Sequence, residues 1–147
     1  MKDKDLGLIF ELFTEIGIIS QLSNTLLEKY LPLGLKSSQF ALMNHLIRVG
    51  GGETHAQLAS TMQVTKGAMT NTLNRLKFHD LIRIEQDSID GRIKRVYITE
   101  KGSEIREESI TSLSSSMLVL KKDIGLNHFE DVLPFLSSLR KILDSKR

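Results

Sequence analysis

Residues 54–102 read THAQLASTMQVTKGAMTNTLNRLKFHDLIRIEQDSIDGRIKRVYITEKG, and the spacing of their apolar side chains changes in the middle. Up to residue 78 these side chains recur every three or four positions, as in helices. Between residues 81 and 98 they partly alternate with charged ones, as in strands. A charged turn, Asp90-Gly91-Arg92, separates the two strand-like runs. Two short helices followed by a basic β-hairpin are typical of a winged helix-turn-helix.

Capping residues set the bounds of the two short helices. Thr54 with Gln57 forms a capping-box pattern, which opens the first helix. Gln63-Val64 makes the turn, and Thr65 caps a second helix that runs to about residue 78. Four apolar side chains of this second helix are expected to face the core: Ala68, Met69, Leu73 and Leu76.

Helical spacing also marks the chain on both sides of this stretch. Four more helices are expected: residues 5–31, residues 37–49 with Ser37 as the N-cap, residues 100–122 with Thr99 as the N-cap, and a last helix that Asn127 opens. The first of these is apolar on more than one side. The third carries an apolar seam at alternating three- and four-residue intervals, the spacing of a helix that packs against another helix. Because such surfaces must be covered, we expect a homodimer.

The expected fold class is therefore mainly α with a small β-hairpin wing. The winged helix-turn-helix domain takes residues 36–102, with strands at residues 81–85 and 93–98. Residues 1–35 and 103–147 form a helical dimerisation region. A chain of 147 residues is long enough for one such domain with its assembly helices.

Composition excludes several classes of protein. The 40% hydrophobic and 26% charged residues are ordinary for a soluble protein, and the lack of cysteine excludes disulfides, thiol catalysis and cysteine zinc sites. The four histidines are scattered, and no nucleophile elbow or glycine-rich phosphate loop occurs, so we expect no metal, no cofactor and no enzymatic activity. Since Glu11 and Glu15 interrupt the apolar N-terminus, we expect no membrane span, and a cytoplasmic location is the default.

Positive charge is concentrated in the stretch that holds the motif. Residues 54–102 carry eight basic and five acidic side chains, a net charge of +3, whereas the rest of the chain carries 12 basic and 13 acidic ones, a net charge of −1. A surface that binds phosphates requires such a concentration of positive charge. This distribution is expected of a protein whose partner is double-stranded DNA, and a solvated charged face is the alternative interpretation of the charge alone.

The second short helix carries a face suited to reading base edges. With its apolar side toward the core, five residues are expected to point outward: Lys66, Gly67, Thr70, Asn71 and Asn74. Asparagine pairs with both hydrogen-bonding atoms of adenine, and threonine bonds to bases or touches the thymine methyl. Gly67 permits either close approach of the DNA backbone or close packing on the first helix. Thr65 and the helix N-terminus offer amide donors to a phosphate.

The hairpin brings further cations to the same domain. Arg92, Lys94 and Arg95 lie on its projecting end, where an arginine suits the neighbouring minor groove. Arg75 lies at the margin of the second helix. It is expected either to take part in DNA binding or to form a buried ion pair, with Asp90 as the candidate partner.

Six short motifs follow one another here: Gln57-Leu58-Ala59, Val64-Thr65-Lys66, Arg75-Leu76, Leu81-Ile82-Arg83, Asp90-Gly91-Arg92 and Thr99-Glu100-Lys101-Gly102. Together they resemble the MarR family of bacterial transcriptional regulators. The resemblance implies a homodimer that binds a pseudo-palindromic operator and usually represses transcription. It also implies that a small, commonly anionic aromatic ligand binds between the dimer helices and the winged domain and releases the DNA.

The resemblance also assigns contacts to individual positions. Its recognition-helix and wing contacts fall on Thr65, Gly67, Thr70, Asn71 and Arg92, and Asp90 orients the wing arginine or pairs with the recognition helix. Asp80 departs from the family, which usually has glycine after the recognition helix. Asn71 stands where many members carry arginine, so the operator sequence is expected to differ. The alternative function is a winged-helix module for protein–protein contact that does not bind DNA.

Overall fold

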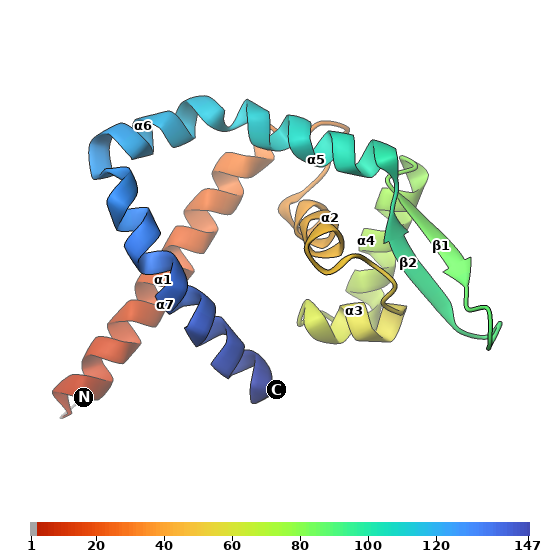
Figure 1. Cartoon of the computed structure of the whole chain (residues 1–147), viewed down its shortest axis with the longest axis horizontal. Coiled ribbons are helices and arrows are strands. Elements are labelled where there is room, and N and C mark those ends of the chain that lie inside the picture. Colours follow the sequence, from red (N-terminus) through yellow and green to blue (C-terminus); the bar gives the residue numbers. More distant parts are fainter. Residues whose placement is uncertain (1–2) are drawn as a thin grey trace. The chain divides into compact units, whose positions relative to one another are not determined.

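The computed structural model describes residues 3–147 (Figure 1). Its elements are α1 (Lys4–Glu28), α2 (Ser37–Val49), α3 (His55–Thr61), α4 (Lys66–Phe78), β1 (Ile82–Gln86), β2 (Lys94–Ile98), α5 (Glu100–Ser112), α6 (Ser114–Ile124) and α7 (Leu126–Ser145). The chain forms two compact units, one up to Thr111 and one over Ser112–Arg147. The predicted fold class, mainly α with a β-hairpin, is confirmed.

The core of the first unit lies between α2, α3, α4 and the hairpin. Its buried apolar residues are Leu35, Leu42, Met43, Leu46, Leu58, Ala59, Met69, Leu73, Leu76, Leu81, Ile82 and Val96. Burial of one such aliphatic side chain contributes about 1.5–3 kcal/mol relative to leaving it exposed. Because helices as short as α3 are marginal in water on their own, this shared core holds α3 and α4 in place.

The strands run over Ile82–Gln86 and Lys94–Ile98 and not over the predicted residues 81–85 and 93–98, and a residue outside the hairpin bridges to it. β1 and β2 pair antiparallel, with Ile84 opposite Val96. Glu53 forms a single bridge to Val96: the Val96 N–H donates to the Glu53 carbonyl at 2.9 Å, and the Gly52 N–H donates to the Val96 carbonyl at 2.9 Å. The segment that enters α3 is therefore bonded directly to the hairpin.

The predicted caps of the winged domain are confirmed. Thr54 Oγ1 accepts a bond from the Gln57 N–H at 3.3 Å, and Gln57 Oε1 accepts one from the Thr54 N–H at 2.9 Å, which completes the capping box. Thr65 and Thr99 each accept the backbone N–H three residues further on, at 3.1 and 3.0 Å. Local side-chain chemistry thus fixes where α3, α4 and α5 begin.

Three predicted helix bounds before α7 are wrong. The first helix, expected to run to residue 31, ends at Glu28. Ser37 is the first residue of α2, and Lys36 precedes it as the N-cap. Gln39 Oε1 accepts the Lys36 N–H at 2.6 Å, so a side chain inside the helix satisfies this end. The helix expected over residues 100–122 is divided at Leu113 into α5 and α6. The serines around the division are weak helix formers, and the side chain of Leu113 is buried.

The start of α7 also differs from the prediction, because the helix begins at Leu126 and not at Asn127. Gly125, with φ at 95°, separates α6 from α7, and no side chain caps α7. The turn favours glycine at this position because side chains other than glycine are strained at this backbone angle. The predicted helix then continues through Pro134.

The apolar faces of α1, α6 and α7 are exposed in the single chain. None of the described residues in these three helices is buried. On α1, for example, Leu8, Phe10 and Leu22 are 64–68% exposed. By length and composition alone α1 would suffice to cross a membrane, but this is weak evidence, because a core helix of a soluble protein passes the same test.

Candidate nucleic-acid interface

The outward face of α4 is the centre of the candidate interface. All five residues predicted to point outward are exposed: Lys66, Gly67, Thr70, Asn71 and Asn74. The opposite face is fixed in the core by Met69, Leu73 and Leu76, which are at most 5% exposed. The helix therefore cannot rotate to bury its polar side without opening the core.

One inward residue of α4 was predicted wrongly. Ala68 is exposed, and Thr72 is buried in the core-facing stripe. The side chains at residues 69, 72, 73 and 76 follow the three- and four-residue spacing of one helix face, and Ala68 lies just beside that face. Hydrophobicity alone favoured alanine, whereas the helical period places threonine inside.

The turn between α3 and α4 sets the direction in which α4 leaves α3. Gln63 has φ at 55°, and the Val64 N–H donates to the Ala59 carbonyl at 3.0 Å. This tight reversal lets Ala59 of α3 pack in the core while Thr65 caps α4. Beyond Thr65, the first N–H groups of α4 have no partners within the helix and are suited to an anion.

Gly67 lies at a point where the surface is open. A Cβ atom at this position would have no atom within 4 Å. Of the two explanations for this glycine, close packing on α3 is therefore excluded. The remaining one, close approach of an external backbone, agrees with its place in the first turn of α4.

The wing carries an arginine held by an aspartate two residues before it. Asp90 Oδ1 accepts the Arg92 N–H at 3.0 Å and the Arg92 Nε–H at 3.1 Å, and Asp90 Oδ2 accepts Nη2–H at 3.0 Å. The Arg92 side chain is nevertheless 91% exposed. Bonds from the side chain and then the backbone of Arg92 lower the pKa of Asp90, and the Asp90 carboxylate raises the pKa of Arg92. Both groups are therefore charged near neutral pH.

The other two wing cations have different surroundings. Lys94 is exposed at the start of β2. Arg95 turns back toward the domain, where its Nη1 donates to the Gly52 carbonyl at 2.8 Å and its Nη2 lies 3.5 Å from an Asp87 carboxylate oxygen. Arg95 therefore holds the wing against the entrance of α3, whereas Lys94 has its charge toward solvent.

The structure does not bring Arg75 to Asp90, so this expected ion pair is wrong. Arg75 Nη2 donates instead to the Leu33 carbonyl at 3.0 Å. Leu33 has φ at 60°, a left-handed conformation that belongs to the connection between α1 and α2. Arg75 thus connects α4 to a segment 42 residues earlier in the chain. Asp90 pairs instead with Arg92, which lies in the same turn.

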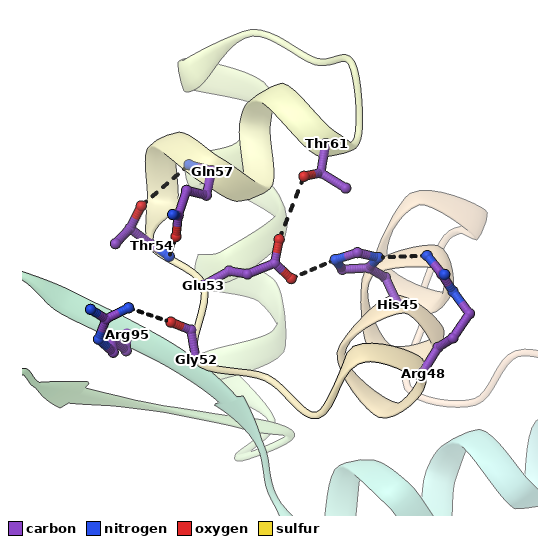
Figure 2. A network of polar contacts seen from close by, with 8 residues as sticks. All are labelled: His45, Arg48, Gly52, Glu53, Thr54, Gln57, Thr61 and Arg95. Carbon is purple, nitrogen blue, oxygen red and sulfur yellow. Dashed lines mark hydrogen bonds and ion pairs between the residues drawn. The ribbon is translucent and has the colours of Figure 1, made fainter. Parts of the chain in front are cut away.

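A polar network that was not predicted joins α2, α3 and the wing (Figure 2). The nearly buried His45 bonds through Nε2 to Glu53 Oε1 at 2.6 Å and through Nδ1 to Arg48 at 3.2 Å. Glu53 also accepts the Thr61 hydroxyl at 3.5 Å. Because Arg48 only donates, His45 Nδ1 accepts, and Nε2 carries the proton. The two contacts of Glu53 join residues eight positions away in separate elements, so neither helical nor strand spacing predicts them.

The described residues, 3–147, hold no group of three His, Cys, Asp or Glu side chains suited to a metal ion. The site is instead a polar helix face, a helix N-terminus and a cationic hairpin tip. Figure 1 shows that this tip projects away from the helices of the winged domain. Such an arrangement of polar and cationic groups is suited to an extended polyanion.

Known proteins share this geometry. Residues 33–93 match the model of the MarR family. The chain is similar to the solved structure of the transcriptional regulator BldR from Sulfolobus solfataricus, with 26% identity over 99% of both chains and a TM-score of 0.74. It is also similar to apo wild-type MarR from E. coli, with 25% identity over 87% of this chain and 96% of that one and a TM-score of 0.72. A mutant MarR from E. coli complexed with operator DNA matches at 25% identity over 89% of this chain and 94% of that one, with a TM-score of 0.68. The chain is therefore similar to the MarR family in sequence over residues 33–93, and to solved MarR-family regulators in fold over most of its length.

Proposed function

We propose that this chain is a DNA-binding repressor, a homodimer that a small ligand releases from a pseudo-palindromic operator. The observation that carries DNA binding is the outward face of α4, where polar positions suited to base edges are exposed together while the opposite face is fixed in the core. The similar mutant MarR that was solved in a complex with operator DNA supports the same partner.

In this proposal α4 enters the major groove. Asn71 and Asn74 pair with adenine edges, and each good bidentate pair contributes about 1–3 kcal/mol of discrimination against the wrong base. Lys66 binds a phosphate, as do the free N–H groups of the first turn beside Thr65, and these contacts set the register of the helix on the duplex.

The wing provides the second contact, in the neighbouring minor groove. Asp90 holds the Arg92 guanidinium at the hairpin tip by three bonds, so the cation is presented in one place. A narrow minor groove has enhanced negative potential, which attracts an arginine positioned in this way. Lys94 adds a phosphate contact from the same hairpin.

The apolar faces of α1, α6 and α7 are exposed in the single chain, and they are the basis for proposing a homodimer. These three helices lie within residues 1–35 and 103–147, which we propose as the dimerisation region. We propose that a second copy of the chain buries these apolar faces. A dimer suits a regulator of palindromic DNA, because the two-fold axis of the protein matches that of the operator. The protein then works in the cytoplasm, with α1 buried against its copy and not in a membrane.

The test of DNA binding is a salt titration of affinity for fragments selected from a random DNA pool. We expect tight binding at low salt that weakens as salt rises, because phosphate contacts release counterions. Arg92→Ala should weaken binding and lower the magnitude of the slope of log K against log salt by about two, because the proposed dimer loses one cation from each of its two wings. Arg140→Ala, which removes the same charge from a half-exposed site on α7, should leave the slope unchanged.

No binding at low salt would contradict the regulator and favour a module for protein–protein contact. Equal slopes for the wild type and Arg92→Ala would show that Arg92 of the wing does not contact DNA, although the protein still binds it. Sedimentation of Arg92→Ala as a dimer is the control that the variant keeps its assembly.

The ligand is proposed to bind in a pocket of about 300 Å³ behind the recognition helix. The pocket is lined by Asn24, Ser37, Ser38, Ala41, Met62, Val64 and Met69. Polar groups of α1 and α2 line part of it, and apolar groups of the helix-turn-helix line the rest, which suits a small aromatic acid. Met69 belongs to α4, so a bound molecule would press on the inner side of the recognition helix and change its approach to DNA.

Titration of hydroxybenzoic acids into the DNA complex tests this part. We expect release at millimolar concentration or below, and we expect Ala41→Phe, which fills the pocket from an exposed position of α2, to abolish release without changing DNA affinity. Unchanged release in Ala41→Phe would place the ligand elsewhere. If none of these acids releases the DNA, the proposal of a releasing ligand is contradicted, whereas the proposal of DNA binding is unaffected.

A further inference from the structure

His55, the first residue of α3, contacts a side chain on the outward face of the recognition helix. Its Nε2 lies 2.9 Å from Thr70 Oγ1. Thr70 Oγ1 in turn lies 3.0 Å from the carbonyl of Lys66, one turn earlier in α4. The Thr70 hydroxyl is therefore held between a side chain of α3 and the backbone of its own helix.

Counting protons decides which groups donate. A hydroxyl has one proton and two lone pairs. Thr70 gives its proton to the Lys66 carbonyl, the usual bond of a threonine inside a helix. His55 Nε2 must then carry a proton and donate to Thr70 Oγ1. The hydroxyl has no proton left for an acceptor on a base.

We propose that His55 is a positioning residue that makes the methyl group of Thr70, and not its hydroxyl, the part that DNA meets. The recognised group is the 5-methyl of a thymine, the one apolar group that base pairs present in the major groove. The inference rests on the proposed DNA binding and adds to it a base preference at one position.

The neighbouring residues leave this methyl accessible. Gly67 lies one turn before Thr70 on the same side of α4, and a Cβ atom there would meet no other atom within 4 Å. Position 67 therefore contributes no side chain that could cover Thr70. Since two bonds fix the Thr70 hydroxyl, the rotamer of this β-branched side chain is fixed before DNA arrives, and its ordering costs little on binding.

Two substitutions of Thr70 separate the methyl from the hydroxyl. Thr70→Val keeps a methyl and removes the hydroxyl, whereas Thr70→Ser keeps the hydroxyl and removes the methyl. On a DNA fragment selected by the wild type, we expect Thr70→Val to bind within about twofold of the wild type. We expect Thr70→Ser to bind about 16-fold more weakly, because the dimer loses one buried methyl-sized group, worth about fourfold, at each of its two half-sites.

Replacing each thymine of that fragment in turn by deoxyuridine removes single methyl groups from the DNA. We expect one thymine per half-site at which this change weakens wild-type binding by about fourfold. Thr70→Ser should show no such loss at that position, because its partner methyl is already absent.

His55 is tested through the same discrimination. In His55→Ala the Thr70 side chain loses one of its two bonds, and we expect the preference for thymine over deoxyuridine to fall toward unity. In His55→Gln an amide N–H replaces the imidazole N–H, and we expect the preference to return. A purely structural role would change the thermal unfolding of both variants and leave the ratio of the two affinities unmoved.

The outcomes separate this inference from DNA binding itself. If the wild type fails to bind DNA at low salt, both proposals fall. If the wild type binds and Arg92→Ala weakens binding, but Thr70→Ser equals the wild type and Thr70→Val does not, only the role of His55 and Thr70 is overturned. A uniform response of all thymines to deoxyuridine would overturn it as well.

Discussion

Gly102 and Gly67 are both helical glycines of the winged domain, and they are glycine for opposite reasons. A Cβ atom on Gly102 would lie 2.2 Å from the Leu81 carbonyl oxygen and 2.7 Å from Ile98 Cγ1. The start of α5 therefore packs on the hairpin through bare backbone. At Gly67 the same atom would lie in open space. Gly102 is therefore required by packing within the chain, whereas Gly67 leaves space for a contact with another molecule.

The pair predicts opposite changes in stability. Gly102→Ala forces the backbone of α5 away from Leu81, and we expect a loss of about 2 kcal/mol in the free energy of unfolding, as in overpacked cores. Gly67→Ala meets nothing and adds a better helix former, so we expect a gain of about 0.5–1 kcal/mol. Urea denaturation followed by circular dichroism measures both. A loss of stability in Gly67→Ala would contradict the open surface at this position.

Gly67→Ala should also bind operator DNA more weakly than the wild type while being more stable. The added methyl occupies the space through which the DNA backbone approaches α4. Equal affinity would mean that the glycine does not serve DNA binding.

The pair of Asp90 and Arg92 predicts a pH dependence of the wing. Because bonds from Arg92 lower the pKa of Asp90, the pair stabilises the folded hairpin above the ordinary pKa of an aspartate. This stabilisation is lost as the pH falls through the lowered pKa. Carboxyl carbon shifts followed by NMR should show Asp90 titrating below the ordinary range. Arg92→Ala should return the pKa of Asp90 toward that range.

Arg83→Ala is the matched control for this titration. It removes another wing arginine, which pairs with Glu85 at 2.7 Å, and should leave the titration of Asp90 unchanged. An Asp90 midpoint that is the same in the wild type and Arg92→Ala would contradict the pairing.

Among the elements, those with local chemical signals could be predicted and those set by distant contacts could not. Thr54, Thr65 and Thr99 cap α3, α4 and α5 as predicted, because a cap depends on residues three positions away. The bridge of Glu53 to Val96 joins segments 43 residues apart, and no spacing within either segment reports it. The division at Leu113 had a partial signal in its serines, but its position depends on burial of the leucine.

In the candidate site, too, features with a local sequence signal could be predicted and contacts between distant segments could not. The outward face of α4 follows from the helical period, so the five exposed residues were predictable. The partner of Arg75 was not, because the Leu33 carbonyl points at it only once the connection between α1 and α2 is folded. The contact of His55 with Thr70 is missed for the same reason, since it joins two helices across a turn.

The junction between α4 and β1 shows how a departure from the family pattern is tolerated. Asp80 has φ at 58°, the left-handed conformation that glycine adopts without a steric cost. Its carbonyl accepts the Thr99 hydroxyl at 2.7 Å, a bond that does not depend on the side chain. The junction thus keeps its shape, and the strain is local to one residue.

Asp80→Gly should therefore stabilise the winged domain. Relief of the left-handed conformation is partly offset by the greater freedom of glycine in the unfolded chain, so we expect a net gain of about 0.5 kcal/mol. Asp80→Ala should instead lose about 1 kcal/mol, because alanine tolerates the left-handed conformation less well than aspartate does. Thermal and urea unfolding measure both variants, and a change of the same sign in the two would contradict this account of the turn.

Exposed apolar side chains are distributed differently in the winged domain and in α1. In the winged domain, exposed large apolar side chains occur singly, as Ile89 does at 95% exposure near the hairpin tip. On α1, by contrast, they recur along the helix, at Leu8, Phe10 and Leu22 among others. Isolated exposed apolar residues are normal on soluble proteins, whereas continuous ones mark an interface. The proposed dimer therefore involves the helical regions and leaves the wing free.

This distinction can be tested by placing the same charge on each surface. Burial of one leucine contributes about 1.5–3 kcal/mol, and a two-fold axis counts it twice, so Leu22→Glu should weaken the dimer by at least about 100-fold. Sedimentation equilibrium should give the wild type twice the chain mass of 16.6 kDa, and Leu22→Glu a mass near one chain at micromolar concentration. Ile89→Glu is the matched control, since it adds the same charge to a more exposed apolar side chain, and it should sediment as the wild type does. A monomeric wild type, or equal masses for the two variants, would show that the apolar face of α1 does not hold two copies together.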